Sequence, residues 1–129
     1  MKEETEPTTI GLSDAAHGKL QELKEAGHFG EMADAYRFAI ALALAHGAIA
    51  PAIGAGRQTI YNVGTLDPDK TIYVAVSALR DAVSEPVYRT AERLAEWGVE
   101  ELHRRSQSGH LSFAEILTEA ESLGAKSSN

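Results

Sequence analysis

Apolar and polar residues alternate near the start of the chain, as they do in a β-strand. Ile10 and Leu12 fall on one face of an extended segment, while Thr9 and Gly11 fall on the other. The alternation predicts a short strand over residues 8–12. The central position of its outward face is a glycine, which has no side chain with which to make a contact.

Two helices are expected after this strand. Ser13 is a favoured N-cap, and apolar residues then recur at helical spacing as far as a stop at Gly27, which predicts a helix over 14–26. A second helix is predicted over residues 31–47, and its segment 38–45 is apolar on every side. A helix without a polar face has to be buried all round. Because a chain of 129 residues offers little material to surround it, we expect a homodimer.

The second half of the chain is predicted to be helical with one short strand. Residues 48–58 contain glycine and proline and should form a connection, and TIYNV at 59–63 fits a strand. Three further helices are predicted, with starts at Asp67-Pro68, Ser84 and Ser112. Their apolar positions are Ile72, Val76, Leu79 and Val83; Ala91, Leu94, Gly98 and Leu102; and Phe113, Ile116, Leu117 and Ala120.

The overall composition is that of an acidic globular protein. Twelve basic residues face 19 acidic ones, giving a net charge of −7, and the chain contains no cysteine. Residues 1–7 are polar and acidic, so we expect a disordered tail there and no secretory signal. No apolar run approaches the ~20 residues of a membrane span. We therefore expect a cytoplasmic protein that does not enter a membrane.

The order of elements over residues 8–47 resembles the ribbon-helix-helix family. The segment is TIGLSDAAHGKLQELKEAGHFGEMADAYRFAIALAL, with Arg37 where that family often carries arginine. The resemblance implies a mainly α fold in which strands from two chains pair to form an intertwined homodimer. Residues 48–129 would then be a C-terminal helical extension. The implied dimer interface consists of Ile10, Leu12, Phe38, Ile40, Ala41, Leu42 and Leu44.

The resemblance also implies a DNA-binding surface. In that family the paired strands enter the major groove and outward side chains read base edges. The implied contacts here are Thr9 and Gly11 on the ribbon and Lys19, Lys24 and His28 beside it. Thr9 can make one modest contact with a base and Gly11 can make none. Glu31 would repel a phosphate at the start of the second helix.

Two functions follow from these observations. The family resemblance implies a small regulator of the repressor or antitoxin type that binds DNA as a dimer. The acidic composition and Gly11 favour an alternative, a protein-interaction adaptor that uses the same dimeric fold without reading DNA. Extensions such as residues 48–129 commonly bind a protein partner or an effector in similar proteins, so a protein partner is expected there by analogy.

The remaining candidate chemistry is sparse. AIGAGRQT lacks the order of a phosphate-binding loop, and no nucleophile is paired with a base. We therefore expect no enzyme activity, no cofactor and no metal. The histidines lack metal-binding spacing, and a metal site would have to be assembled across the fold from His17, His28, His46, His103 and His110.

The helix expected after Ser84 carries both signs of charge. Its glutamates lie one helical turn from arginines, as in Glu100 with Arg104 and Glu101 with Arg105. A solvated, self-paired face explains this pattern, and a patch for an acidic partner or a nucleic-acid backbone is the alternative. Tyr88 and Trp97 fit core or dimer contacts, with a stacking platform as the alternative. The arginines concerned are Arg89, Arg93, Arg104 and Arg105.

Overall fold

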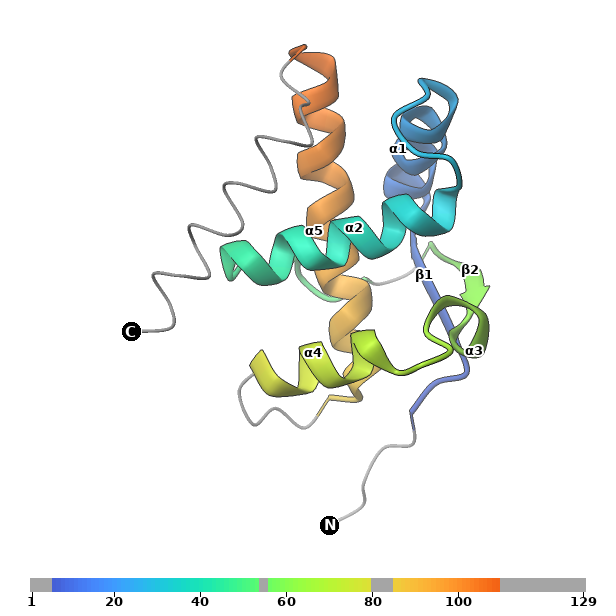
Figure 1. Ribbon diagram of the computed structural model, residues 1–129, viewed down its shortest axis with the longest axis vertical. Helices are drawn as coiled ribbons and strands as arrows, with labels where there is room; N and C mark the ends of the chain where they lie inside the picture. Colours follow the sequence, from blue (N-terminus) through green and yellow to red (C-terminus); the bar gives the residue numbers. More distant parts are fainter. Residues whose placement is uncertain (1–5, 54–55, 80–84, 110–129) are drawn as a thin grey trace.

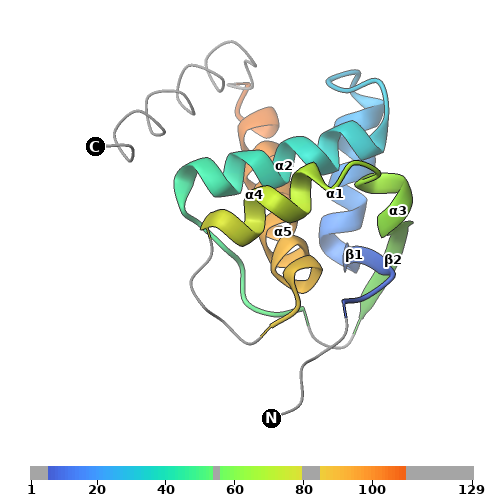
Figure 2. The same ribbon diagram turned by 60° about the horizontal axis from the view of Figure 1, so that its bottom comes forward.

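One long helix forms the centre of the structure. The computed structural model describes residues 6–53, 56–79 and 85–109. Its elements in chain order are β1 (Thr9–Ser13), α1 (Asp14–Glu25), α2 (Met32–His46), β2 (Arg57–Asn62), α3 (Val63–Leu66), α4 (Thr71–Leu79) and α5 (Val87–Gln107). Helix α5 contacts α1, α2, α4 and β1. Helix α1 lies beside α5, whereas α2 and α4 both cross it (Figure 1, Figure 2).

The predicted helix signals operate at the start of α1 and at the ends of α1 and α2. The Ser13 hydroxyl oxygen accepts a hydrogen bond from the Ala16 amide at 3.2 Å and so caps α1. Gly27 and Gly47 have positive φ angles of 84° and 63° just beyond α1 and α2. Glycine adopts this left-handed conformation without steric cost, which allows each helix to end there. The predicted strand-helix-helix order is confirmed.

Several boundaries in the second half differ from the prediction. The helix expected to start at Asp67-Pro68 begins at Thr71, after the short helix α3. Strand β2 covers 57–62 rather than 59–63. Glu6 belongs to the expected disordered tail but contacts the fold. Its carboxylate accepts hydrogen bonds from the Val87 and Tyr88 amides at the start of α5. The helix expected after Ser112 and the apolar position at Val83 lie outside the described residues.

The two strands pair with each other within one chain. Strand β1 runs antiparallel to β2, with Thr9 opposite Asn62 and Ser13 opposite Arg57. A β-bulge interrupts the register between Ile10 and Gly11. The expectation that β1 pairs with its own copy from a second chain therefore differs from the structure, in which β2 takes that position.

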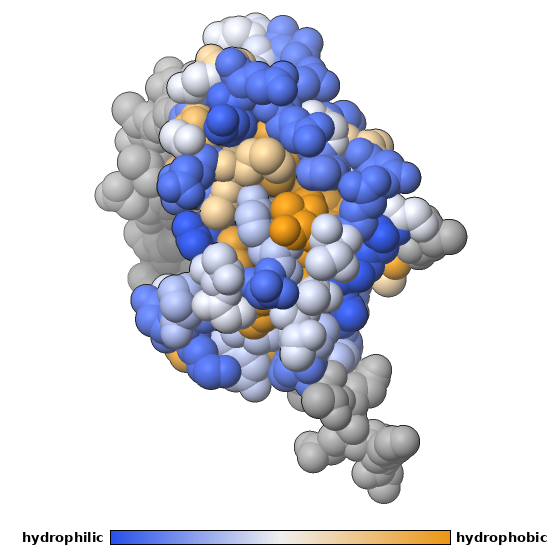
Figure 3. Space-filling model, turned by 90° about the vertical axis from the view of Figure 1, so that its right-hand side faces the viewer, coloured by the Kyte–Doolittle hydropathy of each residue, from blue (hydrophilic) through white to orange (hydrophobic). Residues whose placement is uncertain are grey.

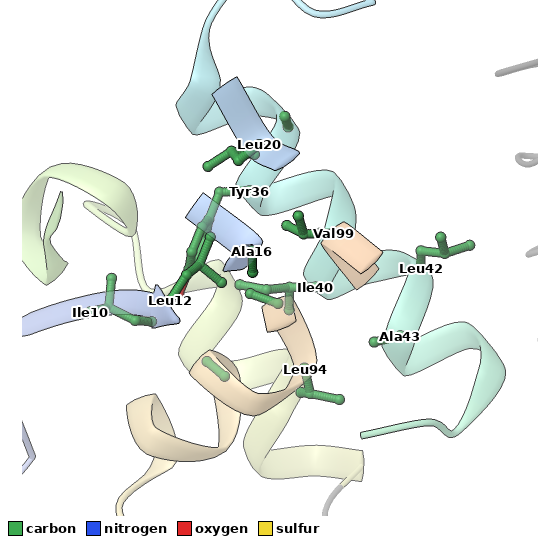
Figure 4. Close-up of a cluster of buried hydrophobic side chains, with 14 of the residues drawn as sticks. Ile10, Leu12, Ala16, Leu20, Tyr36, Ile40, Leu42, Ala43, Leu94 and Val99 are labelled. Carbon is green, nitrogen blue, oxygen red and sulfur yellow. The ribbon is translucent and has the colours of Figure 1, made fainter. Parts of the chain in front are cut away.

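The hydrophobic core lies between β1, the first two helices and α5. Its largest fully buried side chains include Tyr36, Leu20 and Leu12, and Figure 4 shows them converging from different elements. The predicted apolar stripe of α1 is buried as expected, and so are the positions Ala91, Leu94, Gly98 and Leu102 of α5. Fully burying one such aliphatic side chain contributes about 1.5–3 kcal/mol. The core therefore supplies the main driving force for this arrangement.

Helix α2 is covered by α5, and small residues allow the close crossing. A Cβ atom added at Gly98 would lie 2.1 Å from the Ala39 carbonyl oxygen. The backbones of the two helices thus approach each other more closely than any side chain at Gly98 would permit. Helix α5 supplies much of the packing surface that the sequence had suggested a second copy would provide.

This coverage divides the predicted dimer-interface residues into two groups. One group is buried inside the single chain because it faces α5, α1 or the sheet. The other group retains exposure to solvent. The buried residues are Ile10, Leu12, Ile40 and Leu42, and the residues with exposure are Phe38, Ala41 and Leu44. The homodimer itself stays a prediction.

Two glycine substitutions test this packing. A Cβ at Gly11 would lie 1.8 Å from the Gln58 carbonyl oxygen, so Gly11→Ala should push β1 and β2 apart. We expect it to lower the free energy of unfolding by about 3 kcal/mol, the upper end of overpacking penalties. Gly18→Ala is the matched control, because nothing lies within 4 Å of its added Cβ and it is inside α1.

The control should raise the free energy of unfolding by about 0.5–1 kcal/mol, since alanine favours a helix over glycine. Urea denaturation at neutral pH measures both values. A Gly11→Ala protein as stable as the wild type would contradict the close approach of β1 and β2.

Candidate interaction groove

The two ribbon residues predicted to read DNA lie in a covered strand. Thr9 is half-buried and Gly11 is buried. The Gly11 amide donates a hydrogen bond to Glu92 at 2.8 Å, and its carbonyl oxygen accepts one from the Tyr36 hydroxyl at 2.8 Å. Gly11 is therefore enclosed between β2, α2 and α5. Its lack of a side chain serves close packing inside the chain.

Side chains close the edge of β1 that faces away from β2. Besides the two contacts of Gly11, the Ser13 amide donates to Glu96 at 3.1 Å. The Arg57 guanidinium lies 3.5 Å from the Thr9 carbonyl oxygen. Unpaired backbone groups on a strand edge would otherwise be open to pairing with another chain. In this arrangement both edges of β1 are occupied by groups of the same chain.

Glu92 is the charged centre of this closed edge. Its side chain is only 4% exposed, and its carboxylate lies 2.6 Å from Arg57 Nε and 3.0 Å from Arg89 Nη1. A buried carboxylate is tolerated when hydrogen-bond donors and opposite charges surround it. Burial, and next the negative charge of Glu92, raise the pKa of the Tyr36 hydroxyl well above its ordinary value.

The three flanking candidates for DNA contact lie elsewhere on the surface. Lys19 forms an ion pair with Glu100 of α5, and His28 lies 3.2 Å from the Ser106 hydroxyl. Lys24 is exposed near the end of α1. Lys19 and Lys24 lie on α1, which runs away from β1 (Figure 1) over about 18 Å for 12 residues, and His28 follows its end. The five predicted DNA-contact residues are not gathered into one surface.

The arginines of α5 are paired with carboxylates. The Glu101 carboxylate forms ion pairs with Arg104 at 2.5 Å and with Arg105 at 2.8 Å. Of the two predicted pairs, only that of Glu101 with Arg105 therefore forms among the described residues. Burial opposes ionisation of Glu101, but these two guanidinium groups outweigh it and lower its pKa. Arg93 pairs with Glu85 and donates to the Ala50 carbonyl oxygen. The pairing matches a self-paired face.

The aromatic residues of α5 make contacts inside the chain. The Tyr88 hydroxyl donates to Asp67 at 2.8 Å, and the Trp97 ring centroid lies 5.6 Å from that of His46. Within the described ranges no group of three or more histidine, aspartate or glutamate side chains could hold a metal ion. None of the described helices combines the length and apolar character of a membrane span.

A groove between α2 and α4 is an apolar hollow that the sequence did not predict. Its volume is about 440 Å³, and its walls include Ile40, Ala41 and Leu44 from α2 with Ile72 and Ala75 from α4. Figures 1 and 2 show the two helices side by side where both cross α5. Charged residues line the groove only at the end formed by Arg37, Asp67 and Asp69.

Polar contacts fix the separation of the groove walls. The buried Asp67 carboxylate accepts hydrogen bonds from the Ile72 and Tyr73 amides, both at 2.9 Å, and from Tyr88 of α5. Asp67 lies four residues before the first residue of α4. Its side chain thus caps the start of α4 and holds this helix against α5. On the opposite wall, Arg37 Nε donates to the Leu66 carbonyl oxygen at 2.9 Å and links α2 to α3.

A sequence signal for this groove exists in α4. The segment TIYVAVSAL contains no charged residue, and its apolar residues are not confined to one stripe. Val76 is fully buried, whereas Val74 is 63% exposed. A short helix with apolar residues on both its buried and its outward side suggests a contact beyond its own core.

Comparison of the chain with protein-family models, curated proteins and solved structures found no match.

Asp67 can be tested against its near neighbour Asp69. Asp67→Asn removes one acceptor oxygen from a buried group that receives three hydrogen bonds, so we expect a loss of about 2–4 kcal/mol in the free energy of unfolding. Asp69→Asn is the control, because Asp69 is exposed and its hydrogen bonds are local, to Thr71 and to its own backbone. Its effect should be much smaller. Equal losses in chemical denaturation would contradict the anchoring role of Asp67.

Tyr61 links stability to alkaline pH. Its buried hydroxyl has no hydrogen-bond partner among the described residues, and burial raises its pKa above 10.0. Above that pH the unfolded chain loses this proton before the folded chain does, so stability should fall as pH rises. Tyr61→Phe should make this fall shallower without weakening the protein at pH 7. Urea titrations between pH 8 and pH 11 measure the slope, and an unchanged slope would count against the shift.

Proposed function

We propose that the protein is an interaction adaptor that binds an apolar helical segment of a polypeptide in the α2–α4 groove. The observation that carries this proposal is the apolar groove itself, between two helices whose facing segments carry few charges. Binding an amphipathic helix in a hydrophobic groove is a recurrent mode of peptide recognition. The groove volume of about 440 Å³ is large enough to receive several side chains.

The distribution of charge supports a protein partner. The chain has a net charge of −7, and each phosphate contact of a DNA-binding protein needs a cationic or hydrogen-bonding group. Figure 3 shows the side that carries α1, α3 and β2, where hydrophilic residues surround a central apolar area. The arginines nearest β1, Arg57 and Arg89, are held by Glu92. DNA binding of the repressor or antitoxin type stays the alternative prediction.

A gel-shift titration separates these two functions. The full chain is titrated into a random DNA duplex at low salt, where non-specific phosphate contacts are strongest. We expect no retardation at tens of micromolar protein. Retardation that disappears when Lys19 and Lys24 are both changed to glutamate would instead support DNA binding and overturn the adaptor function.

The groove is tested by a charge at its wall. Ala41 is exposed there, so Ala41→Glu should fold normally while placing a carboxylate in an apolar site. In affinity capture from an extract of the source cell, the variant should lose the proteins that the wild type retains. Ala15→Glu, on the exposed side of α1, is the matched control and should retain them. Equal capture by both variants would contradict a role for the groove.

A further inference from the structure

We infer that the polypeptide in the α2–α4 groove is a second copy of this chain, with Val74 of each protomer inserted into the groove of the other. This inference rests on the proposed function of the groove and specifies its occupant. The inference depends on helix α4, which forms one wall of the groove and also carries an exposed apolar residue, Val74. A surface with both features can complement itself.

Helix α4 presents its residues in three directions. Val76 is fully buried, and Ile72 and Ala75 line the groove. Val74 is two positions before Val76, which places it roughly 200° around the helix and toward solvent. Its 63% exposure is the larger of the two values among the exposed large hydrophobic residues of the described chain. The protruding side chain therefore lies on the solvent-facing side of the helix that forms one wall of the groove.

Two-fold symmetry converts this arrangement into reciprocal contacts. In a symmetric dimer, a residue that contacts a given site on the partner is matched by the same contact in the opposite direction. Val74 of one protomer can thus enter the groove at Ala41 and Leu44 of its partner while receiving the partner's Val74. A partner protein of another kind would cover the groove but would need its own complement for Val74.

Charge favours self-association at this face over other faces. Two copies with a net charge of −7 each repel one another, and the repulsion is least where the facing surfaces carry no charge. Residues 38–45 and all of α4 contain no charged side chain. At the charged end of the groove, Arg37 is paired with Asp34, and the Asp67 and Asp69 carboxylates accept hydrogen bonds from amides of α4.

The size of a stable interface requires both helices. A standard interface covers about 800 Å² on each partner, which one helix of nine residues cannot supply. Helices α2 and α4 lie side by side on the same side of α5 and can be covered together (Figure 2). A charge introduced on either helix should therefore separate the protomers.

The oligomeric state provides the first test. Size-exclusion chromatography with light scattering on the full chain, from 1 to 200 μM, should give twice the chain mass of 13.8 kDa for the wild type. Val74→Glu and Ala41→Glu should each give the mass of one chain at concentrations where the wild type is dimeric. Ile49→Glu is the matched control, because Ile49 is another exposed large hydrophobic residue, 42% exposed, and does not line this groove. Circular dichroism establishes that each variant is folded.

Cross-linking tests the reciprocal geometry. The natural chain has no cysteine, so single cysteines can be introduced without background. Val74→Cys and Ala41→Cys proteins of different tag length are mixed and oxidised, and a disulfide between the two is expected. Ala15→Cys replaces Ala41→Cys as the control and should not cross-link to Val74→Cys.

The outcomes separate this inference from the proposed function. A wild-type monomer at 200 μM, or a dimer that persists in both glutamate variants, would overturn self-association through this groove. A monomer that still loses captured proteins on Ala41→Glu would leave the adaptor function standing with a different occupant. A dimer without the disulfide between Val74→Cys and Ala41→Cys would overturn the reciprocal insertion.

Discussion

The arrangement of the sheet depends on one buried carboxylate. Glu92 of α5 receives the Gly11 amide of β1 and the guanidinium groups of Arg57 and Arg89 while remaining 4% exposed. Removing a carboxylate from water costs several kcal/mol, and the cost is offset only when its donors are held in place. Gly11 and Arg57 lie far from Glu92 in the sequence, so these contacts fix β1, β2 and α5 relative to one another. Strand β1 is thereby attached to α5 as well as to β2.

This attachment determines what β1 can do. A two-stranded ribbon that reads DNA requires outward side chains that reach base edges. In the structure one edge of β1 carries β2, and the other is closed by Tyr36, Glu92 and Glu96. Burial of Gly11 between these groups leaves no outward side at the centre of the strand. One apolar surface that remains accessible among the described residues is the groove between α2 and α4.

The sequence predicted the local structure well and its partners poorly. Hydrophobic spacing located β1, α1, α2 and α5 because periodicity reflects which face of an element is buried. The same spacing does not say whether the covering surface belongs to this chain or to another. Helix α2 was therefore expected to need a second copy, whereas α5 covers much of it through the small residue Gly98. The sequence did not single out Glu92. It lies three residues after Arg89, and this spacing is also typical of a solvated, self-paired helix face.

The groove escaped prediction for a related reason, and its rigidity is what makes it suitable for binding. Its two walls come from helices separated by more than 20 residues, and Asp67, which looked like an ordinary cap, holds α4 to α5 through three hydrogen bonds. Arg37 holds α2 to α3 at the same end. Walls fixed by such contacts lose little conformational freedom when a ligand binds, so more of the apolar contact energy remains as affinity. A groove with polar anchors at one end and apolar walls elsewhere is the feature on which the proposed binding of a hydrophobic side chain such as Val74 depends.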